Sequence, residues 1–418
     1  MLFAMINEPV SNQNYPQKQI SVYGWIMIFS VVTLAVIGLV MIFSVTGGQI
    51  LSRYYHRNNL IPPQQPDILR FFMHHGVFLI LGLVVAVTAA FLRPEFYRKT
   101  MKLGLLGAFG LLAAVLILGE NVNGARRWFR FGGFSLQPME VAKVALILYL
   151  AVILEKRTEI MNDIYRGFVQ PMIVVGAMVL FLLLQPDLGS AILFVTVALA
   201  MLYIAGSRLI YFFMALLVVL PFTWYYVAAG WRLSKRIIPF LHPEYFQQGA
   251  AYQIIRSLDA FGSGGFSGWG LGNGPYKMEF LPEAHTDYIA AMIGQELGFL
   301  GIASLILLYG LFLFAGIKIA LRQRQKAFRM FLAMGMTLMI VFQAFINLSV
   351  VMNLIPSKGI TLPFVSYGGS SMILSFAAAG LLLCIDRHTG VYAPAGEVSK
   401  VRAKPTIGGN RRIGLSES

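Results

Sequence analysis

Three titratable side chains, Glu283, His285 and Asp287, lie within five positions of each other and directly before an apolar segment, in FLPEAHTDYIAAMIGQELG, residues 280–298. Such groups can exchange protons. A charge at the edge of a membrane is costly unless it is hydrated, paired or facing a cavity, so it marks a candidate functional site. The structural alternative is that Thr286 or Asp287 caps the following helix, with Glu283 near its positive end. The residues alone leave both interpretations open.

A second polar cluster is NGARRWFRFGGFSLQPMEVAK, residues 123–143, in which Arg126 and Arg127 stand among aromatic residues. Arginine can hold phosphate oxygens through two hydrogen bonds. An interfacial loop whose arginines contact lipid headgroups is the simpler alternative. Within the same cluster, Glu140 and Lys143 are three positions apart and therefore share one helical face. We expect them to form an ion pair, because a charge inside a membrane normally needs a partner.

Two further clusters contain turn-forming residues. In QPDLGS, residues 185–190, we favour capping of the next helix by Asp187 over a role in a cavity. In NLIPSKGITLPFVSYGGSS, residues 353–371, two prolines and three glycines predict a folded loop whose only cation is Lys358. Lys358 could bind a phosphate as a point charge or simply be solvated. Spacing does not decide between these two roles.

The elements that position these clusters are membrane helices. With 57% hydrophobic residues, 12% charged residues and a mean hydropathy of +0.71, the chain is too apolar for a soluble protein of 418 residues. We predict an all-α fold with about ten transmembrane helices of roughly 20 residues each. The first stretch lacks a clear cleavage site and is read as a retained span. The ten stretches begin near residues 22, 71, 103, 140, 167, 188, 209, 288, 330 and 371.

The charge distribution predicts the topology. The formal charge of +15 comes from Lys and Arg that lie mostly in short loops and in the tail, which argues against nucleic-acid binding. Placing both termini in the cytoplasm puts most of these cations inside. Residues 1–21 then form a cytoplasmic segment, 22–387 the membrane domain, and 388–418 a basic, disordered tail. All four polar clusters fall on the extracytoplasmic side, together with a large loop over residues 229–287 between spans 7 and 8.

Two other classes of site are not indicated by the residues. Glycines are frequent between Gly262 and Gly274, which predicts turns and close backbone approach; no strand precedes them, so they do not predict a dinucleotide site. Cys384 is the only cysteine and cannot form an internal disulfide. We see no His and Cys set with the spacing of metal ligands, and therefore no evident cofactor. A divalent cation between a carboxylate and a pyrophosphate stays open.

Four motifs in this order, NGARRW with FSLQPMEVAK, QPDLGSA, GWGLGNGPYKMEFLPEAHTDYIAAMIGQELGFLG and NLIPSKGITLPFVSYGGSS, resemble the SEDS family of bacterial cell-wall proteins. The resemblance covers about residues 22–387. GLGNG followed by LPEAHTD, and IPSKGITLPFVSYGGSS, look more like the members that serve cell division than like those that serve elongation. The chain departs from the family pattern in residues 50–70, a longer, more polar and more proline-rich connection that could contact a partner.

This resemblance implies a ten-span peptidoglycan glycosyltransferase that polymerises lipid II at the outer face of the cytoplasmic (inner) membrane. The essential acidic residue of the family's HTD motif falls on Asp287, which would act as the base, with Glu283 and His285 as supporting residues. Cations for the departing pyrophosphate would be Arg126, Arg127, Lys358 and, if its pairing with Glu140 leaves it in a cavity, Lys143. The resemblance also implies a class B penicillin-binding protein and other division proteins as partners, at the division septum.

Three alternatives remain to be weighed. A lipid II transporter would also have many spans, and carriers often contain internal repeats, but no repeat is visible between the two halves. The polar motifs on one face favour chemistry there over alternating access. An elongation-type polymerase would differ in its biological setting. A scaffold that only recruits a crosslinking partner would not need Asp287.

Overall fold

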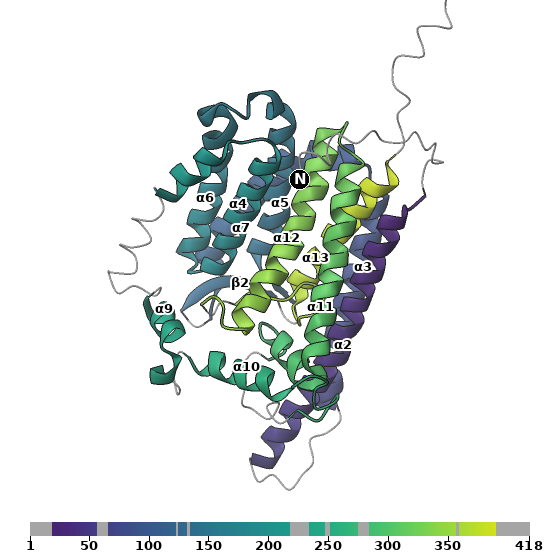
Figure 1. The fold of residues 1–418 in the computed structure, drawn as a ribbon, viewed down its shortest axis with the longest axis vertical. Coiled ribbons are helices and arrows are strands. Elements are labelled where there is room, and N and C mark those ends of the chain that lie inside the picture. Colours follow the sequence, from purple (N-terminus) through teal and green to yellow (C-terminus); the bar gives the residue numbers. More distant parts are fainter. Residues whose placement is uncertain are drawn as a thin grey trace, which may run out of the picture.

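The computed structural model describes residues 19–56, 66–122, 124–131, 134–217, 234–246, 251–274, 284–356 and 359–389. Helices form most of this part of the chain (Figure 1). The long helices are α2 Val22–His56, α3 Pro66–Phe91, α4 Pro94–Leu118, α5 Pro138–Arg157, α6 Gln170–Leu184, α7 Leu188–Ile204, α11 Ile289–Leu321, α12 Ala327–Val351 and α13 Gly369–Arg387. Shorter helical segments are η1 Thr158–Ile160, η2 Ile164–Val169, α9 Ser234–Leu241, η3 Pro243–Phe246 and α10 Tyr252–Ser263.

The chain is a multi-pass membrane protein. Among the described residues, seven helical segments are long and apolar enough to cross a membrane, and α7 is apolar but shorter. Each of the ten predicted starts falls within a helical segment or one residue before it, including residues 209–217, which are helical. The helical fold is therefore confirmed, whereas the count of ten spans stays a prediction. Most of the predicted N-terminal segment and of the basic tail lies outside the described residues.

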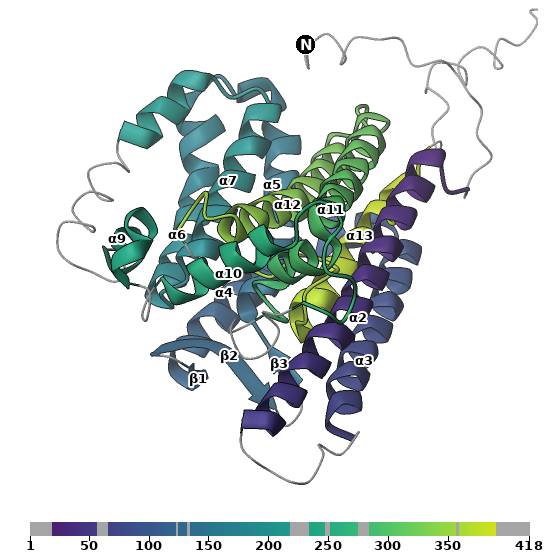
Figure 2. The same cartoon turned by 60° about the horizontal axis from the view of Figure 1, so that its bottom comes forward.

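A small antiparallel sheet interrupts the helical fold between α4 and α5 (Figure 2). Its strands are β1 Glu120–Val122, β2 Ala125–Phe131 and β3 Phe134–Leu136, in the order β1-β2-β3. The sequence predicted only an interfacial loop here. Basic and aromatic residues alternate along part of β2, which is compatible with the period of two in a strand. The other two strands have three residues each, which is too short for such a pattern to be recognised.

The two ends of the described chain meet at one end of the bundle, opposite to β2, α9 and α10 (Figure 1). The main-chain N–H of Ser21 donates to Oδ2 of Asp386 at 2.8 Å, and the Ser21 hydroxyl donates to Oδ1 at 2.6 Å. Arg322 adds an ion pair to the same buried carboxylate at 3.5 Å. These contacts hold the start of α2 beside the end of α13, as expected if both termini lie on one side of the membrane.

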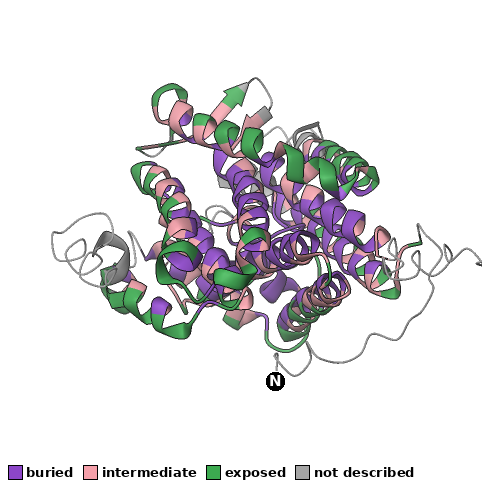
Figure 3. Cartoon of the chain, turned by 90° about the horizontal axis from the view of Figure 1, so that it is seen from above, coloured by how far each residue is buried: buried purple, intermediate pink, exposed green. Residues whose placement is uncertain are grey.

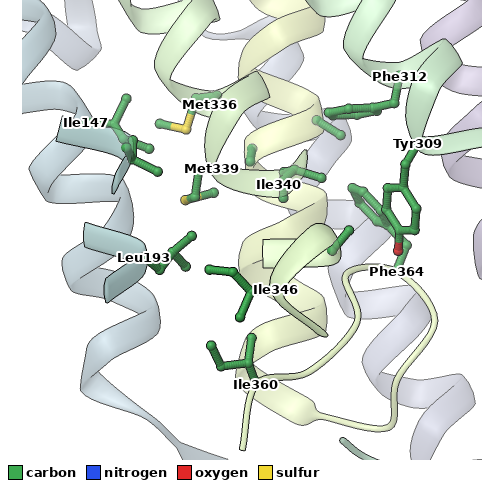
Figure 4. Packing of buried hydrophobic residues seen from close by; sticks show 14 of the residues in the cluster. Ile147, Leu193, Tyr309, Phe312, Met336, Met339, Ile340, Ile346, Ile360 and Phe364 are labelled. Carbon is green, nitrogen blue, oxygen red and sulfur yellow. The ribbon is translucent and has the colours of Figure 1, made fainter. Parts of the chain in front are cut away.

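Helix α12 lies in the interior of the bundle. Figure 3 shows that buried residues are concentrated in the middle of the bundle and exposed ones at its edges. Of its spanning segment 78% is buried, against 22% for α4, so α12 is packed by protein and α4 faces its surroundings. Figure 4 shows side chains from α5, α7 and α11 around those of α12. The labelled members of this cluster are Ile147, Leu193, Tyr309, Phe312, Met336, Met339, Ile340, Ile346, Ile360 and Phe364. A close-packed interior of this kind makes α12 a rigid support for polar residues on its surface.

Helix α11 is broken at Gly298, where φ is 64° and ψ is −156°. A break inside a membrane helix is tolerated where other protein groups satisfy the freed backbone. The glycine-rich loop after α10 does this by pairing with both sides of the break, as the sequence predicted for close backbone approach. The four hydrogen bonds run from Trp269 N to Gln295 O, from Gly270 N to Glu296 O, from Phe299 N to Gly265 O and from Leu300 N to Phe266 O. The part of α11 before the break is therefore a separate short helix, which begins beside Asp287.

Candidate functional site

Asp287 lies in a turn, residues 284–288, that leads into the first half of α11. Its carboxylate packs against Gly359: a Cβ on that glycine would come within 2.8 Å of Oδ2. The N-cap of α11 is Tyr288, which makes no side-chain capping hydrogen bond. The structural alternative, in which Thr286 or Asp287 is the N-cap, is therefore wrong. The chain continues as a turn for one residue beyond Asp287 before the helix starts.

Three consecutive carbonyl groups of this turn each accept a hydrogen bond from the loop before α13 or from α12. This loop comes from the predicted cluster at residues 353–371, so the structure brings two of the four clusters together. The donors are Tyr367 N to His285 O at 2.9 Å, Ser366 Oγ to Thr286 O at 2.6 Å and Asn347 Nδ2 to Asp287 O at 2.8 Å. The main chain that carries Asp287 is thereby held at every residue of the HTD motif.

Two imidazoles flank Tyr367. Its ring lies 5.7 Å from that of His285 in an edge-on arrangement and 5.9 Å from that of His75 on α3. Burial raises the pKa of the Tyr367 hydroxyl, so this group is protonated at neutral pH. The predicted supporting residue His285 therefore joins the Asp287 turn, of which it is part, to Tyr367 through an aromatic contact. His75 was not singled out from the sequence, because two adjacent histidines inside an apolar segment, His74 and His75, give no signal of the residues that they contact.

Glu140 and Lys143 form the predicted ion pair, with a distance of 2.6 Å between Oε2 and Nζ, and both are almost fully buried on α5. Lys143 Nζ also donates to Oε1 of Gln343 at 2.7 Å. Gln343 in turn donates through Nε2 to the main-chain oxygen of Thr361 at 2.9 Å. A polar chain thus leads from the buried pair, across α12, to the loop that holds the Asp287 turn. The mutual attraction of Glu140 and Lys143 and the further hydrogen bond to Gln343 offset part of the cost of burying two charges.

The arginines of β2 contact helix ends. Arg127 donates through Nε to Gln185 O at 2.8 Å and through Nη2 to Pro186 O, just after the end of α6. Arg126 donates to two carbonyls in the last turn of α4, at 3.0 and 3.2 Å. The last carbonyls of a helix lack intrahelical partners and carry partial negative charge, so they attract cations. An anion at either guanidinium would have to share it with these carbonyls.

The remaining predicted residues divide into confirmed and undescribed ones. Asp187 caps α7, as favoured from the sequence: its Oδ1 accepts from Ser190 N at 3.2 Å and its Oδ2 from the Ser190 hydroxyl at 2.7 Å. Glu283 and Lys358 lie outside the described residues, so their roles stay predictions. In the described parts of the chain, no group of three or more His, Cys, Asp and Glu side chains could hold a metal ion.

Sequence reasoning missed the carboxylate of Glu296, which lies fully buried just before the break in α11. It accepts hydrogen bonds from the Ser44 hydroxyl of α2, at 2.8 and 3.0 Å, and from Gly272 N at 3.1 Å. The available signal was an acidic residue inside an apolar segment. This carboxylate links α2, the glycine-rich loop and the short helix that follows Asp287.

The sequence profile of the FtsW/RodA/SpoVE family, described as cell cycle protein, matches residues 25–390. Among curated relatives, a probable peptidoglycan glycosyltransferase FtsW of Geobacter metallireducens is 37% identical over 371 residues, which are 88% of this chain and 96% of that protein. The corresponding protein of Aliivibrio salmonicida is 38% identical over 324 residues, 77% of this chain and 81% of that protein.

Solved structures with this fold include a chain of a peptidoglycan synthase complex, described as coordinating polymerization and crosslinking. It aligns with a TM-score of 0.70 and 27% identity, over 87% of this chain and 97% of that chain. The rod shape determining protein RodA of Thermus thermophilus aligns with a TM-score of 0.62 and 26% identity, over 90% and 99% of the two chains. The profile match over most of the sequence and the high coverage of the curated relatives agree with each other, and the chain therefore belongs to the FtsW/RodA/SpoVE family of cell cycle proteins.

Proposed function

We propose that this chain is a peptidoglycan glycosyltransferase, which polymerises lipid II into glycan strands at the outer face of the cytoplasmic membrane during septal wall synthesis. The observation that carries the proposal is the fixed position of Asp287. Its turn is held at three consecutive carbonyls, and its carboxylate packs against Gly359. Relatives at 36–39% identity are named probable peptidoglycan glycosyltransferases, which supports the reaction class.

In this reaction the N-acetylglucosamine hydroxyl of one lipid II attacks the anomeric carbon at the lipid-linked end of the growing glycan. The new bond is a glycosidic C–O bond, and the bond that breaks joins the sugar to the polyprenyl pyrophosphate. Asp287 accepts the hydroxyl proton, and the pyrophosphate departs with the electron pair of the broken bond. A general base that is already positioned lowers the barrier for such an attack, and direct displacement inverts the configuration at the sugar carbon.

The departing pyrophosphate needs cations, because its negative charge increases as the bond breaks. We assign this role to Arg126, Arg127, Lys143 and Lys358, as the resemblance implied. The described contacts favour Lys143 over the two arginines as a group connected to the Asp287 loop, since Gln343 joins it to Thr361. Glu140 balances the charge of Lys143 before substrate binds. A divalent cation at the pyrophosphate would add to these groups and is part of the tests below.

We also propose a class B penicillin-binding protein and other division proteins as partners, and the division septum as the location. Support for the first partner is the likeness to a chain of a peptidoglycan synthase complex. Division is favoured over elongation because the named FtsW relatives are 36–39% identical to this chain, whereas the RodA structures are 26–27% identical. Undecaprenyl-linked substrate would enter from the membrane, in which this multi-pass chain is embedded.

A lipid II transporter is the second candidate, and one observation favours it. The break at Gly298 resembles the discontinuous helices that line substrate sites in many transporters. Four backbone hydrogen bonds close this break and tie it to the glycine-rich loop. A transporter that uses this element for alternating access would have to break and re-form them in each cycle, which makes the enzyme the better-supported proposal.

The experiment that separates the candidates uses the purified full chain with its class B penicillin-binding partner. Lipid II in detergent is supplied, with and without Mg²⁺ or Mn²⁺, and the glycan products are sized on a gel. The proposal predicts polymer from the wild type and none from Asp287→Asn. If neither protein makes polymer while proteoliposomes move labelled lipid II across the bilayer, the transporter is correct. Polymer from both proteins would leave the function standing and remove Asp287 as the base.

A further inference from the structure

We propose that Asn347 is a positioning residue for Asp287. In this role it contacts neither substrate nor the reacting carboxylate, and instead fixes the main chain from which the carboxylate projects. The inference rests on the proposed glycosyltransferase function. Asn347 is 60 positions from Asp287 in the sequence, near the C-terminal end of the apolar helix α12, and only the folded structure shows that the two are neighbours.

One side-chain nitrogen of Asn347 joins the two loops of the site. Nδ2 donates to the main-chain oxygen of Asp287 at 2.8 Å and to the main-chain oxygen of Ile360 at 2.6 Å. Ile360 directly follows Gly359, against which the Asp287 carboxylate packs. The same amide therefore sets the separation between the Asp287 turn and the loop that contains Gly359. If the amide is lost, the turn is still held at the two residues before Asp287, but the main chain of Asp287 itself is freed from Ile360, and the carboxylate loses its fixed direction.

The support for this amide is rigid. Asn347 is 1% exposed and lies on α12, whose interior packing includes Ile340 and Ile346 (Figure 4). One turn earlier on the same helix, Gln343 donates to the main-chain oxygen of Thr361 at 2.9 Å. The two amides are four positions apart, share one face of the helix, and hold two successive carbonyls of the loop. Side chains on a packed helix hold a site more accurately than side chains on a loop.

The hydrogen-bonding pattern of Asn347 shows which part of the side chain matters. Both of its donor contacts are made, whereas its buried Oδ1 has no hydrogen-bond partner among the described residues. A buried acceptor without a partner is unfavourable, so an amide at this place is explained by its donors. Asp has nearly the same shape and offers no donor when ionised, and Ala removes the group altogether. These two substitutions test the donor role separately from the shape.

Gln323 provides a matched control at the other end of the bundle. It is also a buried amide, and its Nε2 donates to Ile385 O at 2.9 Å and to Thr389 Oγ1 at 2.6 Å. It thus joins the turn after α11 to the end of α13, as Asn347 joins two segments of the site. Gln323→Ala and Gln323→Glu repeat the two changes of Asn347 far from Asp287. They measure how much kcat falls when any buried amide that connects two segments is removed.

The test measures initial rates of lipid II polymerisation by the full chain with its class B penicillin-binding partner. We expect Asn347→Ala and Asn347→Asp each to lower kcat by about 10–100-fold with KM changed by less than about twofold, because a displaced catalytic group slows chemistry while substrate binding is kept. The Gln323 variants should keep kcat within about threefold. Thermal melting identifies variants that fail to fold; if Asn347→Ala fails, Asn347→Leu decides, because Leu has nearly the shape of Asn and neither a donor nor a charge.

Three results would overturn the proposal. They are a wild-type kcat in Asn347→Ala, an equal loss of kcat in the Gln323 variants, or a rise in KM in place of a fall in kcat. The first of these results includes a loss confined to Asn347→Asp, which would be an effect of the added charge. Failure of the proposed function gives a different result: the wild type itself makes no polymer, or Asp287→Asn makes as much as the wild type.

Discussion

The carboxylate of Asp287 and the Cα of Gly359 are packed so closely that a single added methyl group would come within 2.8 Å of Oδ2. Real Cβ atoms do not tolerate such a distance, and one of the two groups must move. Asn347 holds the main chain of Asp287, and the same amide holds the main chain of Ile360, which directly follows Gly359. The side chain of Asp287 is therefore the part that would give way.

Gly359→Ala should consequently reduce activity more than stability. We expect a fall of about 10–100-fold in kcat for lipid II polymerisation, since a displacement of about 1 Å in a catalytic group costs this much. The measurement is a steady-state rate together with a thermal melt. Gly310→Ala in α11 is the matched control, because a Cβ there meets nothing within 4 Å and activity should be unchanged. Normal kcat in Gly359→Ala would show that the carboxylate position is not critical.

Removing one partner of the buried pair should be more harmful than removing both. Lys143→Met leaves Glu140 buried without its cation, and we expect a loss of about 3–5 kcal/mol in the free energy of unfolding. The double variant Glu140→Leu with Lys143→Met contains no buried charge and should recover at least half of that loss. Thermal melts in detergent check this order. If the double variant instead loses as much stability as Lys143→Met and Glu140→Leu lose together, the two charges are stabilised independently of each other.

Arg127 should stabilise the fold by connecting β2 to the end of α6, whether or not it also binds substrate. Arg127→Ala removes hydrogen bonds to the carbonyls of Gln185 and Pro186 and should lower stability by about 1–3 kcal/mol. Arg130→Ala, which breaks a half-exposed ion pair with Glu120, should cost less than about 1 kcal/mol. If the two variants melt alike, the contacts of Arg127 contribute no more than a surface pair, and pyrophosphate binding would be its main role.

The break in α11 should depend on the absence of a side chain at residue 298. In Gly298→Ala the Cβ would lie 2.4 Å from Gly268 N, at a backbone φ of 64° that other residues rarely adopt. We expect a loss of at least about 2 kcal/mol in stability. Gly107→Ala in α4, where a Cβ meets nothing within 4 Å, should be neutral or slightly stabilising. If Gly298→Ala left the free energy of unfolding unchanged, the close contact between the glycine-rich loop and the break in α11 would be contradicted.

Much of the fold was predictable because hydrophobic length and local spacing determine it. The predicted starts of the ten apolar stretches fall within a helical segment or one residue before it, the pair at positions 140 and 143 follows from helical periodicity, and Asp187 caps α7 as its position before an apolar run suggested. Motif order also led to the correct family. The inferences about helices, the ion pair and the cap use neighbouring residues only, whereas the family follows from the order of motifs along the chain.

Contacts between distant segments could not be read in the same way. Asn347 looks like an isolated polar residue in an apolar helix, and its meaning depends on carbonyls of residues 287 and 360, which any sequence would supply. The short strands around β2 arise from backbone pairing across few residues, and this leaves little pattern. Arg127 was read from its charge, whereas its contacts are set by where α6 ends. Backbone partners are invisible to an argument from side-chain types.

The most direct test of the account compares two acidic residues that the sequence predicted on the same face of the membrane. Asp287→Asn and Asp187→Asn are each assayed for lipid II polymerisation with the class B partner, at equal amounts of folded protein. We predict that Asp287→Asn lowers the rate by at least about 100-fold, as expected for loss of a general base. Asp187→Asn, which alters only the cap of α7, should stay within about threefold of the wild type. Polymerisation at the wild-type rate by Asp287→Asn would contradict the role of Asp287 as the general base.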